Sequence, residues 1–199
     1  MLKELRIAGF GGQGVILSSI AVGRAATLYE GNYATMIQSF GPEARGGAAS
    51  ATLILSTEPI LYPYVAQPDI LVVMSQEAYT RFTPELKAGG LLLVEQDLVH
   101  LDNLVDGRHI YSIPATRIAE GLGKKMVLNV VMTGFLCAVT RVIGHEACRK
   151  AVADLVPARF KDLNLEAFDK GYEYGMNLTT PNPSQDDVDA ALMSLESME

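Results

Sequence analysis

The chain has 199 residues, of which 49% are hydrophobic and 20% are charged, so it can bury the core of one large domain but is cramped for two. Its formal net charge of -7 argues against a protein whose main activity is to neutralise the phosphates of nucleic acids or of anionic lipids. An acidic chain suits neutral or basic partners.

The start of the chain and its cysteines indicate a reducing compartment. Residues 1–5 lead directly into a strand-like run and lack the charged, apolar and small-residue regions of a signal peptide. Cys137 and Cys148 lie in segments that read as helical, and their spacing matches neither a metal pair nor a redox pair. The apolar stretch 126–143 is interrupted by polar residues and lacks the roughly 18 uninterrupted apolar residues of a spanning helix. We expect a cytoplasmic protein without membrane association.

The first elements read as a strand, a glycine turn and a helix. An apolar run at 5–8 leads into Gly9-Phe10-Gly11-Gly12-Gln13-Gly14, and apolar residues at helical spacing follow from Val15 to Gly23. Residues 33–39 read as a second strand, reached within the length that a right-handed crossover takes. The chain is therefore expected to begin with a parallel β-α-β unit.

A third strand is expected at 48–56. The connection that leads to it from the second strand is too short to hold a crossover helix, so a mixed sheet is predicted. Residues 69–74 form a continuous apolar run that is typical of a strand covered on both faces. Ser75 is placed to cap a helix over 76–82. Further strands are expected at 91–94 and 109–113.

From Pro114 onward the pattern is helical, and the helices are expected to flank the sheet. Met126, Met132 and Phe135 are expected to lie in the core. The predicted helices are at 115–121, 125–143, 145–155 and 165–174.

Residues 176–199 contain no Lys or Arg and carry several acidic side chains, which predicts a loosely attached acidic tail. The chain is thus divided into a domain at 1–175 and a tail at 176–199. The predicted fold class is α/β, a single three-layer α/β/α domain with a mostly parallel, mixed sheet and a Rossmann-like start.

The glycine turn has two interpretations. Gly9, Gly11 and Gly14 have the spacing of the dinucleotide fingerprint, in which glycines let backbone N–H groups approach a pyrophosphate at a helix N-terminus. The fingerprint also asks for Asp or Glu at the end of the second strand, where this chain has Gln38 and Ser39. The turn therefore either packs the helix on the sheet, leaving room for a small anion, or binds a nucleotide.

A second glycine-rich loop, Ser39-Phe40-Gly41-Pro42-Glu43-Ala44-Arg45-Gly46-Gly47, follows the second strand. We expect it at the same sheet edge as the glycine turn, because both leave the carboxyl ends of what we take to be neighbouring parallel strands. It reads either as an exposed turn with solvated charges or as a docking loop. In the docking interpretation, the guanidinium group of Arg45 makes paired hydrogen bonds to a phosphate or carboxylate. Gly46 and Gly47 then allow the backbone of a partner to approach closely.

The candidate residues for contact with an anion, a cofactor or a partner subunit come from these two loops and from the apolar helix. Asn129 in that helix reads either as a buried amide hydrogen bonded to backbone or as a ligand or partner contact. No catalytic residue and no metal ligand is expected on this chain. The candidate set is Gly9, Gly11, Gly12, Gln13, Gly14, Ser39, Gly41, Pro42, Glu43, Arg45, Gly46, Gly47 and Asn129.

The two glycine loops, with Ser75-Gln76-Glu77-Ala78-Tyr79 and Asn129-Val130-Val131-Met132, resemble the gamma subunit of 2-oxoacid:ferredoxin oxidoreductases. The match runs in order over residues 4–175, and the loop from Ser39 to Gly47 is much more specific than the glycine turn. The chain looks closest to the 2-oxoglutarate branch, and pyruvate, 2-oxoisovalerate and indolepyruvate enzymes carry similar domains.

The resemblance implies a complex in which this chain has no redox centre of its own and is inactive when isolated. Alpha and beta subunits, with delta as a further candidate, would hold thiamine diphosphate, Mg²⁺ and an iron–sulfur cluster. The complex would convert 2-oxoglutarate and coenzyme A to succinyl-CoA and CO2 while reducing ferredoxin. The lack of a Cys set for a cluster on this chain agrees with that division. Isolated copies could homodimerise through the surface meant for partners.

Two other functions stay open from the residues alone. One is a free-standing nucleotide-binding oxidoreductase that uses Gly9, Gly11 and Gly14. The other is a regulatory module that senses a small anion. Binding of NAD(H), NADP(H) or FAD by the isolated chain would favour the first, and thermal stabilisation by phosphate or adenine nucleotides would favour the second.

Overall fold

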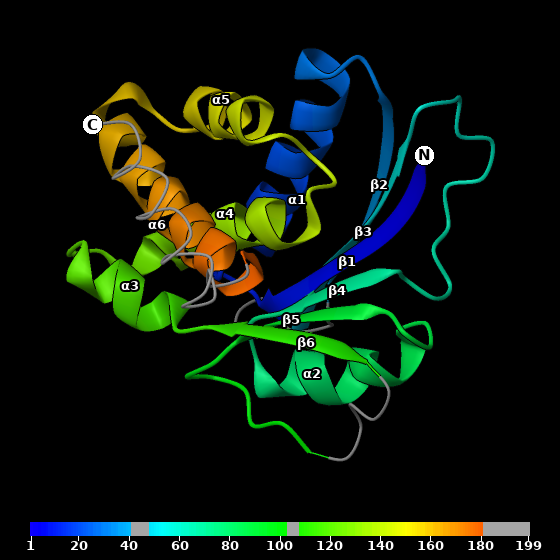
Figure 1. Ribbon diagram of the computed structural model, residues 1–199, viewed down its shortest axis with the longest axis horizontal. Helices are drawn as coiled ribbons and strands as arrows, with labels where there is room; N and C mark the ends of the chain where they lie inside the picture. Colours follow the sequence, from blue (N-terminus) through cyan, green and yellow to red (C-terminus); the bar gives the residue numbers. More distant parts are fainter. Residues whose placement is uncertain (41–47, 103–107, 181–199) are drawn as a thin grey trace, which may run out of the picture.

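The computed structural model describes residues 1–40, 48–102 and 108–180, which form one sheet flanked by helices (Figure 1). Its strands are β1 (Leu2–Phe10), β2 (Tyr33–Phe40), β3 (Ala48–Ser56), β4 (Ile70–Val73), β5 (Leu91–Glu95) and β6 (His109–Ile113). Within the described ranges they pair in the order β2-β3-β1-β4-β5-β6. β1, β4, β5 and β6 pair in parallel, whereas β3 is antiparallel to β1 and β2. The predicted mixed sheet is confirmed.

Helices cover both faces of the sheet, which confirms the predicted three layers (Figure 1). The helices are α1 (Val15–Arg24), α2 (Gln76–Phe82), α3 (Ala115–Gly121), α4 (Leu128–Thr140), α5 (His145–Leu155) and α6 (Lys161–Thr179). α1, α4, α5 and α6 lie on one face and α2 on the other. Short π or 3-10 turns occupy Ala25–Tyr29, Thr83–Glu85, Lys125–Val127 and Ala158–Phe160.

β3 lies between β1 and β2, so the strands that lead into the two glycine loops are not neighbours, and that expectation was wrong. The connection after β2 is too short for a crossover, so β3 turns back beside β2, and its other edge pairs with β1. The carboxyl ends of β1 and β2 still reach one sheet edge, because Phe10 lies opposite Ala48 and Phe40 lies opposite Ala49.

β4 is buried on both faces, as its continuous apolar run predicted. Val72 packs in the cluster on the α4 side and Val73 in the cluster on the α2 side, and neither is more than 1% exposed. Just after β4, the Ser75 hydroxyl accepts a hydrogen bond from the Ala78 amide at 3.2 Å and caps α2. The predicted strand and the predicted cap are both confirmed.

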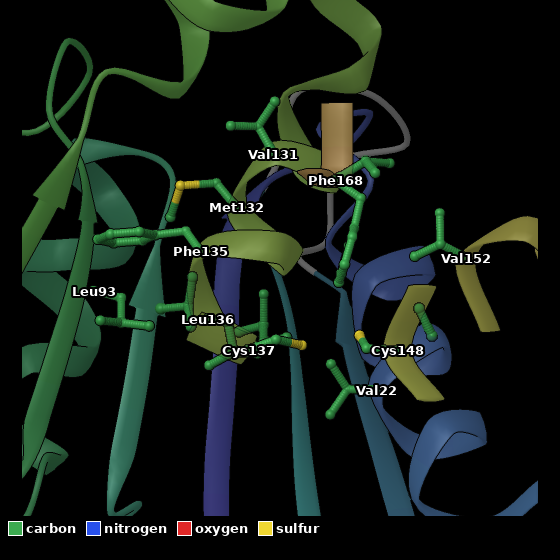
Figure 2. Close-up of a cluster of buried hydrophobic side chains, with 14 of the residues drawn as sticks. Val22, Leu93, Val131, Met132, Phe135, Leu136, Cys137, Cys148, Val152 and Phe168 are labelled. Carbon is green, nitrogen blue, oxygen red and sulfur yellow. The ribbon is translucent and has the colours of Figure 1, made fainter. Parts of the chain in front are cut away.

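α4 forms the centre of the larger core, with Met132 and Phe135 buried as predicted. Figure 2 shows side chains from β5, α1, α5 and α6 gathered around it. The sequence predicted one helix over 125–143, but Lys125–Val127 forms a 3-10 turn and α4 ends at Thr140, with Arg141 as its C-cap. Arg141 adopts the left-handed conformation, with φ of 52°, which stops the helix.

The backbones of α4 and α6 touch, and glycines on both helices make this contact possible. A Cβ atom on Gly171 of α6 would overlap the carbonyl oxygen of Val131, and one on Gly134 of α4 would overlap that of Phe168. One turn further along α6, a Cβ atom on Gly175 would lie 2.7 Å from that of Ala138. No larger side chain fits between the two helices at these positions.

The two cysteines are free, buried thiols on α4 and α5, drawn close to each other in Figure 2. A hydrogen bond with Cys148 and burial raise the pKa of Cys137 well above its usual value. A thiol that stays protonated packs as a small apolar side chain and is not a nucleophile at neutral pH.

α6 is longer than the predicted helix over 165–174 and runs to Thr179, so residues 176–179 of the predicted tail belong to its last turn. The rest of that tail, 181–199, lies outside the described residues. Within the described ranges, no helix combines the length and the apolar composition needed to cross a membrane.

We predict that Gly171→Ala lowers the free energy of unfolding by about 3 kcal/mol, because the new methyl group forces the two helix backbones apart. Gly121→Ala on α3 is the matched control, since a Cβ atom there meets nothing within 4 Å. It should change stability by less than about 1 kcal/mol. Urea unfolding of both variants measures the difference, and equal effects would contradict the packing argument.

Candidate functional site

The glycine turn connects β1 to α1 at the carboxyl edge of the sheet. Gly12 and Gly14 have φ of +97° and +75°, in the left-handed region that favours glycine. The amide of Gln13 donates to the carbonyl of Phe10 at 3.1 Å and closes the turn. Gly14 is then the N-cap of α1 and provides no side chain to cap it.

Gln13 ties two strands together at this edge. The amide of Phe10, at the end of β1, donates to Gln13 Oε1 at 2.6 Å, and Gln13 Nε2 donates to the carbonyl of Met74 after β4 at 2.8 Å. The helices that follow β1 and β4 leave for opposite faces of the sheet, and ligands of open α/β sheets bind at such a point. A Cβ atom on Gly9 would lie 2.5 Å from Gln13 Oε1, so Gly9 makes room for this side chain.

Asn129 fills the other side of the turn. It is 3% exposed, and its Nδ2 lies 3.4 Å from the carbonyl oxygen of Gly14. Its own carbonyl accepts from the hydroxyls of Ser18 at 3.1 Å and Thr133 at 2.7 Å. A Cβ atom on Gly14 would lie 2.5 Å from the Asn129 amide. Asn129 is thus a buried amide that contacts the backbone of the turn, and these contacts favour the packing interpretation of the turn.

The second glycine loop is only partly described. Ser39 is exposed near the end of β2 and lies opposite Ser50 of β3, at the same sheet edge as the glycine turn. The remaining candidates of this loop lie outside the described residues: Gly41, Pro42, Glu43, Arg45, Gly46 and Gly47.

A cavity of about 380 Å³ opens beside the glycine turn. Met126 projects at its rim and is 73% exposed, so the expectation that Met126 lies in the core was wrong. It sits in the 3-10 turn before α4, outside the helix that packs in the core. Lys125 brings a positive charge to the cavity and pairs with Glu120 at 2.7 Å. The cavity is lined by Gly12, Gln13, Leu98, Thr116, Lys125, Met126 and Leu128.

Glu95 hydrogen bonds to two residues that line this cavity, Leu98 and Thr116, and was not among the residues expected at the site. It is fully buried at the end of β5, where Oε2 accepts from the Leu98 amide at 2.7 Å and Oε1 accepts from the Thr116 amide at 2.9 Å. One carboxylate therefore holds the loop that follows β5 and the first turn of α3, which follows β6. The available signal was an acidic residue directly after the apolar run at 91–94.

Among the described residues, no group of three or more His, Cys, Asp and Glu side chains is arranged to hold a metal ion. The polar groups that converge at the carboxyl edge are backbone amides, Gln13, Asn129, Glu95 and the Lys125 ammonium. Such an arrangement can bind and orient a polar or anionic group, and most of its hydrogen bonds position the turn itself.

We predict that Glu95→Gln destabilises the chain by about 2 kcal/mol, because one of the two backbone amides then faces an NH2 group and loses its acceptor. The control is Glu166→Gln on the exposed face of α6, which should cost less than about 0.5 kcal/mol. Thermal and urea unfolding compare the two variants. Equal stability would show that the buried carboxylate does not hold the loop after β5 and the first turn of α3.

Comparison with known proteins now identifies the family. The family model for pyruvate ferredoxin/flavodoxin oxidoreductase matches residues 4–174. The 2-oxoglutarate synthase subunit KorC of Methanocaldococcus jannaschii is 46% identical over 180 residues, which cover 89% of this chain and 96% of the relative. The crystal structure of a keto/oxoacid ferredoxin oxidoreductase gamma subunit from Geobacter sulfurreducens is 35% identical with a TM-score of 0.79, covering 89% of this chain and 98% of that one.

A further relative has a different size. The ketoisovalerate oxidoreductase subunit VorA of Methanothermobacter thermautotrophicus is 30% identical over 174 residues, which cover 86% of this chain but 36% of that longer protein. In VorA the matching domain is therefore one part of a longer polypeptide. Both the match over nearly the whole chain and the shared fold lead to one conclusion: this chain belongs to the pyruvate ferredoxin/flavodoxin oxidoreductase family.

Proposed function

We propose that this chain is the gamma subunit of a 2-oxoglutarate:ferredoxin oxidoreductase. The observation that carries the proposal is the 46% identity to a 2-oxoglutarate synthase subunit across 96% of that subunit's length. The match therefore covers nearly the full length of that subunit. The complex would convert 2-oxoglutarate and coenzyme A to succinyl-CoA and CO2 and pass the electrons to ferredoxin.

In this proposal the chemistry is divided among several chains. Thiamine diphosphate supplies the decarboxylation and an iron–sulfur cluster the electron transfer, and both, with Mg²⁺, would be held by the alpha and beta subunits and by a delta subunit where present. This chain would contribute surfaces that complete and stabilise the assembly. The free thiols of Cys137 and Cys148 agree with a reducing cytoplasm as its location.

We further propose that the carboxyl edge of the sheet, with the glycine turn and the loop after β2, faces a partner subunit along the path of coenzyme A. The cavity beside Gly12 and Gln13 and the ammonium of Lys125 support this role, because the phosphates of coenzyme A attract a positive charge. Arg45 would add a second cation from the loop after β2.

Assembly is tested by anaerobic affinity purification of the tagged chain from its native cells. We expect larger subunits to co-purify with iron, thiamine diphosphate and 2-oxoacid-dependent viologen reduction that is faster with 2-oxoglutarate than with pyruvate or 2-oxoisovalerate. The isolated chain should be inactive. A lone chain that binds NAD(H), NADP(H) or FAD in calorimetric titration would instead support a free-standing oxidoreductase.

The coenzyme A path is tested in the assembled complex. Lys125→Gln and Arg45→Ala should each raise the KM for coenzyme A roughly fivefold to tenfold, because each removes a charge-assisted contact worth about 1 to 1.5 kcal/mol. Lys150→Gln, an exposed change on α5, is the control and should leave the KM unchanged. Unchanged values for both test variants would remove coenzyme A from this edge.

A further inference from the structure

The segment between β3 and β4 carries an unusual cluster of exposed apolar side chains. We call residues 59–68 the aromatic arm. Leu61, Tyr62 and Tyr64 are 95%, 69% and 61% exposed, and the rings of the two tyrosines pack on each other with centroids 5.3 Å apart. Three large apolar side chains that lie this close together in water are a feature of interaction surfaces.

The arm is fastened at both ends. At its start, the Thr57 amide donates to the carbonyl of Met1 at 3.0 Å. At its end, the Asp69 amide donates to the carbonyl of Glu4 at 2.8 Å. Val65, within the arm, is buried and 8% exposed, and the carbonyl of Pro68 accepts from the Lys87 amide at 3.1 Å.

Prolines restrict the backbone of the aromatic arm between these hydrogen-bonded ends. Pro59, Pro63 and Pro68 each fix one backbone φ angle near −65°, and the residue before each proline is also restricted to extended conformations. The exposed side chains are therefore displayed on a largely preformed segment. Less conformational entropy is lost when such a segment binds than when a free loop does.

The arm contains no charged residue in a chain that is 20% charged. Glu58 and Asp69 border it on the two sides. Interface cores are depleted of charge and enriched in tyrosine and other aromatic side chains, whereas the rim of an interface is polar. The composition of the arm fits a neutral, apolar groove on a partner and does not fit a nucleic acid or a membrane surface rich in anionic lipid.

The arm leaves the amino edge of the sheet, opposite to the glycine turn (Figure 1). Ser56 at the end of β3 lies opposite Leu2 at the start of β1, and the glycine turn follows the other end of that nine-residue strand. Nine residues of strand span about 30 Å. Changes in the arm therefore do not reach the cavity beside Gly12.

Two observations indicate what covers the arm. Three side chains of this size bury on the order of 500 Å², which is less than the roughly 800 Å² that each partner buries in a stable interface. The arm is therefore too small to form a stable interface by itself with any partner, and it can act only as the anchor of a wider contact. In VorA the matching domain makes up 36% of a longer polypeptide, so a domain of this family can be joined covalently to a much larger protein.

We propose that the aromatic arm is the anchor by which this chain docks into a neutral, apolar groove of a larger subunit of the oxidoreductase. This inference rests on the proposed function, because it takes the partner to be a subunit of that complex. Tyr62 and Tyr64 enter the groove with Leu61, and the charged residues at the two ends of the arm remain at the rim.

The test measures the affinity of the full-length chain and its variants for the other subunits of the complex. Those subunits are purified anaerobically, and each labelled variant of the chain is titrated into them. Tyr62→Ala/Tyr64→Ala should raise the Kd at least about tenfold, as expected for aromatic anchors at the centre of an interface. Leu28→Ala is the control, since Leu28 is also a large apolar side chain with 63% exposure but lies outside the arm. The control should leave the Kd within about twofold.

Two further readouts separate docking from folding and from chemistry. The urea midpoint of each isolated arm variant should equal that of the wild type, because the altered side chains are exposed. At saturating concentrations of the variant, the assembled complex should keep the kcat and the KM for coenzyme A of the wild type.

The outcomes differ for the two proposals. If the wild-type chain binds the other subunits and the arm variants bind them with the same affinity, the anchor is overturned and the proposed function stands. Arm-dependent dimerisation of the isolated chain, with unchanged affinity for the other subunits, assigns the arm to a second copy and also overturns it. Failure of the wild-type chain to bind any oxidoreductase subunit overturns the proposed function and the anchor together.

Discussion

The direct backbone contact between α4 and α6 is the constraint on which the larger core depends. It exists because Gly134 and Gly171 carry no side chain where the helices meet. α4 can therefore be covered by α6 on its outer side while it rests on the sheet and against α1 and α5. Asn129, in the first turn of the same helix, supports the glycine turn at the sheet edge. Packing of the core and geometry of the candidate site are linked through one buried helix.

The two ends of the sheet have different physical characters. At the carboxyl edge, Gln13 and Glu95 use their side chains to satisfy backbone amides beside a cavity whose lining is largely apolar and includes Lys125. At the amino edge, the aromatic arm exposes apolar side chains without any charge. A cavity with largely apolar walls and a few polar groups suits a small ligand, whereas an exposed apolar arm suits a groove on another protein. A subunit that completes a larger enzyme can use both ends without conflict.

Local patterns in the sequence were sufficient for most of the elements. The apolar run at 69–74 and the hydroxyl of Ser75 predicted a doubly covered strand and a capped helix, since both depend on neighbours in the chain. The short connection after β2 predicted a mixed sheet because a crossover helix needs more residues. The motifs of the two glycine loops indicated the family, which the comparisons confirmed.

Contacts between distant segments could not be read in this way. No local pattern shows that β3 enters between β1 and β2, because pairing on its second edge depends on the complete sheet. The position of Met126 at a cavity rim follows from a 3-10 turn that helical periodicity does not distinguish from the helix after it. Glu95 reads as the polar end of a strand, and only the fold brings the amides of Leu98 and Thr116 to its two oxygens. Residue types and their spacing determined the elements and the family, whereas the arrangement of the polar groups required the tertiary structure, because hydrogen-bond partners far apart in sequence meet only when the core has packed.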